Sequence, residues 1–491
     1  MITAKTFAGK HYAVLGLARS GLATVEALLA SGARVTAWDD KESARSSLQA
    51  KLVGRGTAAE GSGGGVSSPA PNPSTIESTF DGPPPQPSAR EELEVANFVD
   101  GDLTQFDSIV VTPGLPLNRH PIAERAAEAG VEIIGDIELF ARARSELPPH
   151  KVVGITGTNG KSTTTALVHH ILKTAGVPTT MGGNIGLPIL SQNPLPEGGV
   201  YVLELSSYQI DLTQSLDCDV AVLLNITPDH LDRYENFEAY AASKARLFSM
   251  QTFPHTAILT SDVWRNSVVD REWFTSLHLD RGFAADEYVA GNLGSAVYGG
   301  EAFLSPTIPF AQQSDWSTLQ GPHNAQNAAA AIAVAAALGL SDAQIERGLR
   351  TYPGLPHRMQ RIRDQDGVLF VNDSKATNAE AAAPALAAYP KVRWIVGGQA
   401  KAETLGDTAN HLDHVVRAYT IGDAGPMFAQ LLREAGVDVS ECESLENAVK
   451  MAAGDSLPGE TVLLSPASAS FDQFRDFEAR GDRFRELVEG L

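Results

Sequence analysis

The chain has 491 residues, which is more than one hydrophobic core normally serves, and its 43% hydrophobic and 20% charged composition is that of a globular protein, so we expect three domains. A net charge of -21 argues against a nucleic-acid partner, because such binding depends on clustered lysine and arginine. The two cysteines, Cys218 and Cys442, lack the spacing of a zinc site or a disulfide framework, which indicates a reducing cytoplasm.

Three times along the chain, a short apolar strand leads into a glycine-rich turn and then a helix, at 11–40, at 151–172 and from about 354 onward. This order is typical of parallel α/β folds that bind nucleotides. We therefore predict an α/β protein with a Rossmann-like domain over 1–146, a central P-loop ATPase-type domain with a parallel sheet over 147–353, and a Rossmann-like C-terminal domain over 354–491.

Two segments need a separate interpretation. Residues 54–90 are rich in Gly, Ser and Pro, so they cannot bury enough apolar surface to offset the entropy of ordering, and we predict a disordered insertion on the first domain. Its proline run could bind a partner, but a plain surface loop is favoured. The longest apolar run, 327–340, is too short to cross a bilayer and predicts a packed helix without membrane insertion.

Residues 154–168, GITGTNGKSTTTALV, approach an ATP-binding phosphate loop without matching its commonest form. In the pattern G-x-x-x-x-G-K-[ST], Gly160 and Lys161 require a glycine at 155, where Ile155 stands. The glycines still let backbone N–H groups approach a phosphate, and Lys161 adds a mobile positive charge. Ser162 can offer its hydroxyl to Mg²⁺. The alternative, a plain strand-to-helix turn, needs no Lys-Ser-Thr after its glycine.

Further polar residues follow the predicted strands of the central domain. Glu204 closes the strand at 200–205, and His230 follows the strand at 220–227. A lone Glu or His usually has a structural role, but ligands of open α/β sheets bind at the strand ends, so both are candidate Mg²⁺ contacts. Lys244, in AASKARLF, is by its own surroundings an ordinary surface lysine of a helix.

Nine motifs together resemble the Mur ligases, the enzymes that build the peptide stem of bacterial peptidoglycan. These motifs are TGTNGKSTTT, GGNIG, LELSSYQ, NITPDHLDRY, YAASKARLF, GPHNAQNAAAA, GLPHRMQ, NDSKATN and SPASASFDQF. Within that family, NDSKATN and SPASASFDQFRDFEARG are most similar to the enzyme that adds D-glutamate to UDP-N-acetylmuramoyl-L-alanine. The resemblance implies an ATP-dependent ligase that forms an acyl phosphate and acts on these two small molecules, and we expect a monomer in the cytoplasm.

The resemblance also implies an ATP site and a metal site. The residues it assigns to ATP are Gly157, Thr158, Asn159, Gly160, Lys161, Ser162, Thr163, Asn327, Arg358 and Asp373. It implies two Mg²⁺ ions, held by Ser162, Glu204, His230 and a carbamylated Lys244. The expected catalytic residues are Lys161, Glu204, His230 and Lys244. Apart from the resemblance, either Asn324 or Asn327 could cap the alanine-rich helix.

The two remaining substrates have implied positions as well. The UDP-substrate residues are Leu17, Ala18, Asp39, Thr112 and Asn184, and the D-glutamate residues are Lys375, Thr377, Lys401, Ser470 and Phe477. The chain departs from common family residues at four positions, with Ala18 for glycine, Thr112 for serine, Gln399 for aspartate and Ser468 for cysteine.

Three other functions stay open from the sequence. A Mur ligase that adds L-alanine, a diamino acid or a dipeptide would keep the ATP site and change the C-terminal pocket. A non-catalytic nucleotide sensor could share the fold, because fold does not determine function. A Rossmann oxidoreductase is the weakest alternative, because GLARSG places Ala18 where a dinucleotide site has its middle glycine.

Overall fold

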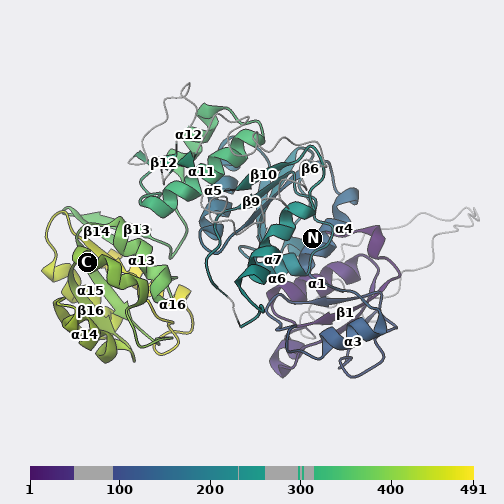
Figure 1. The fold of residues 1–491 in the computed structure, drawn as a ribbon, viewed down its shortest axis with the longest axis horizontal. Helices are drawn as coiled ribbons and strands as arrows, with labels where there is room; N and C mark the ends of the chain where they lie inside the picture. The colour runs from purple at the N-terminus through teal and green to yellow at the C-terminus, as the bar shows by residue number, and fades with distance from the viewer. Residues whose placement is uncertain (49–91, 230–231, 260–296, 299–300, 303–314) are drawn as a thin grey trace, which may run out of the picture. The chain divides into compact units, whose positions relative to one another are not determined.

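In the computed structural model of the full chain, the described residues are 1–48, 92–229, 232–259, 297–298, 301–302 and 315–491 (Figure 1). The insertion predicted at 54–90 and the candidate ligand His230 lie outside these residues. The chain groups into two compact units, which we describe separately. Among the described residues, Met1–Thr158 and Val177–Ala257 make up the first unit, and Asn159–Gly176 belongs to the second together with the described residues from 258 onward.

The first sheet, in the first unit, has five parallel strands in the order β3-β2-β1-β4-β5. These strands are β1 (His11–Leu15), β2 (Arg34–Trp38), β3 (Leu93–Val95), β4 (Ser108–Val111) and β5 (Ile133–Ile134). The helices around them are η1 (Lys5–Phe7), α1 (Arg19–Ala30), α3 (Ile122–Ala129), α4 (Asp136–Ala143) and η2 (Arg144–Glu146). The strand order reverses between β1 and β4, and ligands of doubly wound folds bind beside such a reversal. The sheet is thus Rossmann-like, as predicted.

The second sheet has the order β10-β9-β6-β8-β7, and its β6–β8, β6–β9 and β7–β8 pairs are parallel. Its elements are β6 (His150–Thr156), β7 (Thr179–Gly183), η3 (Ile189–Ser191), β8 (Gly199–Glu204), α6 (Ser207–Asp211), β9 (Val220–Leu223), α7 (Phe237–Ser249) and β10 (Thr256–Leu259). A Cβ at Gly154 of β6 would lie 2.7 Å from Sγ of Cys218 and 3.3 Å from Cδ1 of Leu247 on α7. Gly154 therefore serves strand packing, which explains its offset from the common phosphate-loop pattern.

The second unit contains three helices that pack on one another, α5 (Lys161–Thr174), α11 (Pro322–Ala337) and α12 (Asp342–Thr351). The backbone of Gly348 in α12 lies so close to α5 that a Cβ there would be 2.8 Å from Cα of Ile171. The alanines of α11 are largely buried, which confirms the packed helix predicted for 327–340. A short antiparallel pair, β11 (Val297–Tyr298) and β12 (Glu301–Ala302), also belongs to this unit.

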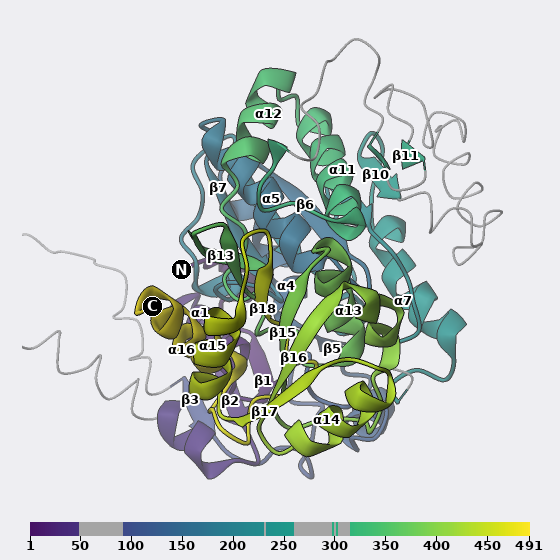
Figure 2. The ribbon, with the colours of Figure 1, turned by 90° about the vertical axis from the view of Figure 1, so that its left-hand side faces the viewer.

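The third sheet has six strands in the order β13-β14-β18-β15-β16-β17, in which only β13 runs antiparallel. The strands are β13 (Gln360–Gln365), β14 (Val368–Asn372), β15 (Val392–Gly397), β16 (Val415–Ile421), β17 (Val439–Glu443) and β18 (Thr461–Leu464). One core packs the sheet on α13 (Ala379–Ala388) and α14 (Gly425–Glu434), near η5 (Gly406–His414). A second core packs the opposite face on α15 (Leu445–Asp455) and α16 (Phe477–Glu489) (Figure 2).

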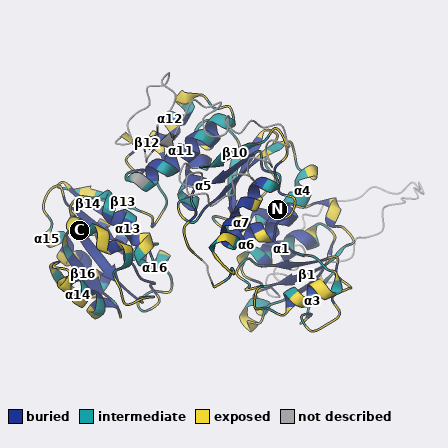
Figure 3. Ribbon diagram, in the orientation of Figure 1, coloured by how far each residue is buried: buried dark blue, intermediate teal, exposed yellow. Residues whose placement is uncertain are grey.

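The inner strands of the three sheets are largely buried, whereas the edge strands β3, β7, β10, β13 and β17 are mostly half-buried or exposed (Figure 3). Because strands covered on both faces read as continuous apolar runs, their positions could be predicted from the sequence. Each sheet lies inside one of the three predicted domains, while the exact borders at 146 and 353 stay a prediction. Within the described part of the chain, no helix is long and apolar enough to cross a membrane.

Candidate functional site

The phosphate-loop motif lies between β6 and α5. Gly160 is the residue before α5 and has a left-handed backbone with φ of 83°. Gly157 has φ of 152°, and a Cβ there would lie 3.0 Å from Cβ of Leu224. Both positions therefore favour glycine. The first turn of α5 carries Lys161 and no acidic residue, so its free N–H groups and positive helix end can bind an anion.

The loop is held in place by residues of the first unit. The backbone N–H of Thr158 donates to the carbonyl oxygen of Asn225 at 2.9 Å. The Oγ1 of Thr158 accepts from the backbone N–H of Thr227 at 3.0 Å and lies 3.1 Å from the Tyr240 hydroxyl. The loop thus keeps a defined shape because neighbouring segments bond to its backbone and side chain.

In the second unit, two residues assigned to ATP by the resemblance lie beside α5. Nη2 of Arg358 donates to Oγ of Ser162 at 3.1 Å. Oδ1 of the buried Asn327 accepts from Oγ1 of Thr164 at 3.3 Å, and the Asn327 amide donates to Asn324 at 3.1 Å. Neither asparagine caps α11, whose N-cap is Gly321 without a side-chain hydrogen bond, so the capping interpretation is wrong.

Glu204, a predicted metal ligand, has one buried carboxylate oxygen without a hydrogen-bond partner among the described residues. It ends β8 beside Ile155 of β6, and its side chain is only 2% exposed. Oε1 accepts from the Asn184 amide at 2.8 Å, whereas Oε2 is buried without a hydrogen-bond partner among the described residues. An unpaired buried carboxylate oxygen is costly, and a cation would satisfy it. No cluster of three or more His, Cys, Asp or Glu side chains suited to a metal lies in the described ranges.

Lys244 lies in the interior of the first unit, on α7, with 2% exposure. Its Nζ donates to the carbonyl oxygen of Gly157 at 2.9 Å and lies 4.8 Å from the centre of the Tyr240 ring. The interpretation as an ordinary surface lysine is therefore wrong. The lysine amine thus lies next to the backbone of Gly157 in the phosphate loop.

Three residues predicted for the UDP-substrate meet at the turn that follows β1. The backbone N–H of Leu17 donates to Oδ2 of Asp39 at 2.7 Å, and that of Thr112 donates to the Leu15 carbonyl at 3.2 Å. Gly16 has φ of 93°, and a Cβ there would collide with the Thr112 side chain. Ala18 is exposed next to this turn, whereas Asn184 directly follows β7 of the second sheet and bonds to Glu204.

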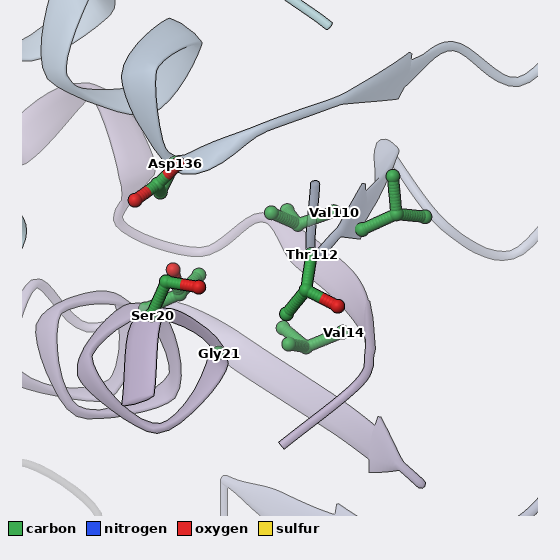
Figure 4. Close-up of a pocket in the computed structure, with 8 residues that line it drawn as sticks. Val14, Ser20, Gly21, Val110, Thr112 and Asp136 are labelled. Atoms are coloured by element: carbon green, nitrogen blue, oxygen red, sulfur yellow. The ribbon is translucent and has the colours of Figure 1, made fainter. Parts of the chain in front are cut away.

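A small pocket opens between β1, α1, β4 and the start of α4 (Figure 4). Figure 4 shows Asp136 and Ser20 on opposite sides of it, with Thr112 alongside. Burial raises the pKa of Asp136 to about 6, and its Oδ1 has no hydrogen-bond partner among the described residues. Sequence reasoning missed Asp136; its only signal is an acidic residue placed directly after a short apolar strand, in IIGDIELF.

The predicted D-glutamate residues come from loops at the carboxyl edge of the third sheet. Nζ of Lys375 lies 3.8 Å from the centre of the Phe477 ring, and Ser374 donates its hydroxyl to the Phe477 carbonyl at 2.8 Å. Gln399 and Ala469 exchange two backbone hydrogen bonds, of 2.9 and 3.0 Å. These bonds join the loop that carries the exposed Lys401 to the loop that carries the buried Ser470, while Thr377 is half-buried two residues beyond Lys375.

Arg480 of α16 is the largest omission of the sequence reasoning. Its guanidinium group is 1% exposed and donates to the Ser374 hydroxyl at 3.0 Å and to the carbonyl oxygens of Ser374, Ser468 and Ala469 at 2.9, 3.0 and 3.3 Å. Burial lowers its pKa to about 10. Arg480 thus ties the loop after β14 to the loop after β18. In the sequence it is one arginine among several in a polar helix.

Asp373, predicted to bind ATP, is fully enclosed at the end of β14. Its carboxylate accepts from the Ser465 hydroxyl at 2.7 Å and from the Met359 backbone N–H at 3.1 Å. Burial raises its pKa to about 7, although these two bonds and the charges of Arg358 and Arg480 act in the opposite direction. Asp373 can therefore change its charge near neutral pH.

Comparison with family models gives two matches. Residues 155–335 match the Mur ligase middle domain, and residues 357–468 match the Mur ligase glutamate ligase domain. The first match contains the phosphate loop, Glu204 and Lys244. The second match contains Arg358, Asp373 and the loop after β14, and it ends at Ser468 in the loop after β18.

Curated relatives resemble the chain over its full length. It is 53% identical to the UDP-N-acetylmuramoylalanine–D-glutamate ligase of Novosphingobium aromaticivorans, over all of this chain and 97% of that protein. It is 50% identical to the ligase of the same name from Zymomonas mobilis, over the whole of both chains.

The solved structure of the UDP-N-acetylmuramate–alanine ligase of Thermotoga maritima has a TM-score of 0.52 to this chain at 17% identity, and the match covers 98% of this chain and 99% of the other. At that identity the likeness concerns the fold. It confirms the predicted three-domain α/β architecture.

Proposed function

Because this chain belongs to the Mur ligase family, we propose that it joins D-glutamate to the L-alanyl carboxylate of UDP-N-acetylmuramoyl-L-alanine with the hydrolysis of ATP to ADP and phosphate. The observation that carries the proposal is the unpaired, buried Oε2 of Glu204 at the strand end next to the phosphate-loop strand. A phosphate loop alone would fit many nucleotide-binding proteins. An open carboxylate oxygen beside it favours phosphoryl transfer, which requires a metal ion.

The proposed reaction has two steps. An oxygen of the L-alanyl carboxylate attacks the γ-phosphorus of ATP, the bond to ADP breaks, and an acyl phosphate forms. The D-glutamate amine then attacks the acyl carbon, phosphate leaves, and the nitrogen loses a proton. Both partners of the first step are anions, so Lys161 and the first turn of α5 would offset their repulsion by binding the transferred phosphate. Arg358, whose guanidinium group reaches Ser162, would add positive charge there.

Magnesium fits the residues that are present. When bound, Mg²⁺ neutralises phosphate charge and aligns the reacting oxygens. Ser162 and Glu204 would hold one ion, and His230 with a carbamylated Lys244 would hold a second. The buried position of Lys244 beside Gly157 supports this role, since a carbamate there would face the phosphate loop. ATP, two Mg²⁺ ions and the carbamate are thus the proposed reactive components.

The proposed choice of amino acid depends on the third sheet. D-glutamate has two carboxylates, which need cations and neutral donors at separate positions. Lys375 lies over the Phe477 ring, and the paired backbones of Gln399 and Ala469 bring the loops of Lys401 and Ser470 together. The predicted positions therefore supply two lysines and a hydroxyl from three loops. Thr377 would complete this pocket.

The other residues that the resemblance assigns to ATP would bind the nucleotide.

For the UDP-substrate, we propose the turn after β1 and the start of the loop after β4, with Leu17, Ala18, Asp39 and Thr112, together with Asn184. The contacts of Leu17 with Asp39 and of Thr112 with Leu15 support this assignment. We also infer a cytoplasmic monomer whose domains divide at 146/147 and 353/354. Light scattering of the purified protein tests the monomer, because a dimer would double the measured mass.

The test of the function is phosphate release from ATP with UDP-N-acetylmuramoyl-L-alanine present. D-glutamate is compared with L-glutamate, L-alanine and meso-diaminopimelate. Phosphate release with D-glutamate, and with none of the other three amino acids, supports both the proposed reaction and the proposed pocket. Release with a different amino acid keeps the ligase and removes the assignment of Lys401, Ser470 and Phe477. No release with any of the four supports a nucleotide sensor.

A further inference from the structure

Two loops of the first unit are fastened together by an arginine that the proposed reaction does not use. Arg233 lies between β9 and α7. Its Nη2 donates to the carbonyl oxygen of Leu115 at 2.7 Å, and its Nη1 lies 3.5 Å from the carbonyl oxygen of Gly114. Two side chains of the loop after β4 also bond to the segment that carries Arg233. Asn118 and Arg119 donate to the Asp232 carbonyl oxygen at 3.1 and 3.2 Å. The loop after β4 begins at Thr112, a proposed UDP-substrate residue.

The Arg233 side chain is fixed on its other side by an aromatic ring. Its guanidinium carbon lies 4.2 Å from the centre of the Tyr208 ring, on α6. A guanidinium group over an aromatic face is attracted by the ring, more strongly where both are partly shielded from water, as here. The hydrogen bonds to carbonyl oxygens and the stacking on the ring act on the same guanidinium group. Together they hold the Arg233 side chain in one orientation more firmly than either interaction alone.

The Tyr208 ring connects this contact to the phosphate loop. It stacks on Tyr234 with ring centres 6.1 Å apart, and Tyr234 lies 5.4 Å from Tyr240. The Tyr240 hydroxyl lies 3.1 Å from Oγ1 of Thr158, and its ring lies beside the Lys244 amine. The hydroxyl of Tyr234 is held by Asp211 at 2.8 Å. A continuous series of packed side chains thus runs from the substrate loop to the phosphate loop inside one compact unit.

We propose that Arg233 is a positioning residue of the ligase reaction, which holds the loop after β4 in register with the phosphate loop through its bonds to Gly114 and Leu115 and its stack on Tyr208. The inference rests on the proposed function, because it assumes that the UDP-substrate binds along the loop after β4. Arg233 itself bonds to backbone carbonyls and does not contact the reacting groups. It acts through the loop on the placement of the acyl carboxylate.

The experiment measures KM for UDP-N-acetylmuramoyl-L-alanine, KM for ATP and kcat in Arg233→Ala, together with calorimetric binding of the UDP-substrate without ATP. We expect KM and Kd for the UDP-substrate to rise about tenfold, because a charged hydrogen bond and a stack are lost. KM for ATP should stay within about twofold, since the contacts of Arg233 with described residues are to Gly114, Leu115 and Tyr208. A purely structural role would instead change both KM values and the melting temperature together.

Arg246→Ala is the matched control. Arg246 is also partly exposed in the same unit, and it also donates to two backbone carbonyls, those of Asp211 and Thr213, but it does not bind the loop after β4. We expect this variant to keep the wild-type KM for the UDP-substrate. An equal rise in Arg246→Ala and Arg233→Ala would overturn the proposal, as would an unchanged UDP-substrate KM and Kd in Arg233→Ala.

Tyr208 provides the second variant pair if Arg233→Ala does not fold. Tyr208→Phe keeps the aromatic face and should bind the UDP-substrate as the wild type does, whereas Tyr208→Leu should weaken binding several-fold. Equal binding by these two variants contradicts the proposal. A wild-type protein that does not bind the UDP-substrate overturns both the proposed function and this inference, while wild-type turnover with unaffected variants overturns the inference alone.

Discussion

The phosphate loop and the proposed D-glutamate pocket are built in different ways from the same kind of fold. The phosphate loop is a single stretch between β6 and α5, and two glycines give it its shape. The pocket of the third sheet is assembled from loops after β14, β15 and β18, and the buried Arg480 bonds two of them together. The first is a continuous motif, and the second exists only after the chain has folded.

This difference predicts how each region responds to substitution. In the phosphate loop, the backbone supplies most donors, so side-chain changes should alter chemistry and leave the loop in place. In the proposed D-glutamate pocket, the buried Arg480 side chain joins the loops after β14 and β18 through four hydrogen bonds, so its removal should disturb both shape and stability. Substitutions that separate these two responses test the comparison.

Lys161→Met should have the largest effect on turnover. The substitution removes the mobile cation from the phosphate loop while a similar side-chain volume remains. We expect kcat for D-glutamate-dependent phosphate release to fall by about 10²–10³-fold, the cost of losing one charged stabilising group. The melting temperature should change little. Lys173→Met at the opposite end of α5 is the control, and an equal loss there would contradict the role of Lys161.

Lys244→Ala should have the next largest effect on turnover. If a carbamate at this position serves the reaction, the variant should lose about 10²-fold or more of its activity. Small carboxylic acids added to the assay should restore part of it, because they can enter the space left and supply an oxygen. The measurement is phosphate release at increasing acetate concentration. Full activity of Lys244→Ala without any acid would rule out the carbamate.

Arg480→Met should affect the D-glutamate pocket and leave the phosphate loop intact. The change removes the donor from the carbonyls of Ser374 and Ser468, whereas the Ala469 carbonyl keeps its bond from the Gln399 N–H, so the free energy of unfolding should fall by about 2–4 kcal/mol. KM for D-glutamate should rise about tenfold, with a smaller change in KM for ATP. Denaturant unfolding and initial-rate kinetics measure the two effects. Arg483→Met, on the exposed side of the same helix, is the control.

Features that depend on a short stretch of sequence could be predicted from the sequence. The inner strands, the phosphate loop and the position of Glu204 at a strand end follow from apolar runs and from the edge at which ligands bind, whereas Lys375 was named from the resemblance. Arg480 and Asp136 could not be predicted, because their roles depend on loops that are distant in the sequence. Lys244 was recognisable only by resemblance, since its burial results from how α7 packs near the phosphate loop.

The last prediction concerns the dependence of folding stability on pH. Burial raises the pKa of Asp373 from 3.8 to about 7 in the folded protein. Between these values, the folded chain keeps a proton that the unfolded chain has released, so stability should decrease as pH rises from about 4 to about 7. The slope from this group is at most about 1.4 kcal/mol per pH unit. Asp373→Asn cannot lose this proton and should lack that slope.

Asp476, in the same domain, should have the opposite effect on the pH dependence of stability, because its pKa is lowered in the folded protein. It caps α16 through a hydrogen bond from the Ala479 backbone N–H at 2.7 Å, which lowers its pKa. Its stabilising effect should therefore be present at neutral pH and be lost as pH falls through its folded pKa. Urea unfolding of the wild type, Asp373→Asn and Asp476→Asn from about pH 7 to below pH 3.8 compares the two pH dependences. If the difference in stability between wild type and Asp373→Asn did not change with pH, burial would not be what sets the charge of Asp373.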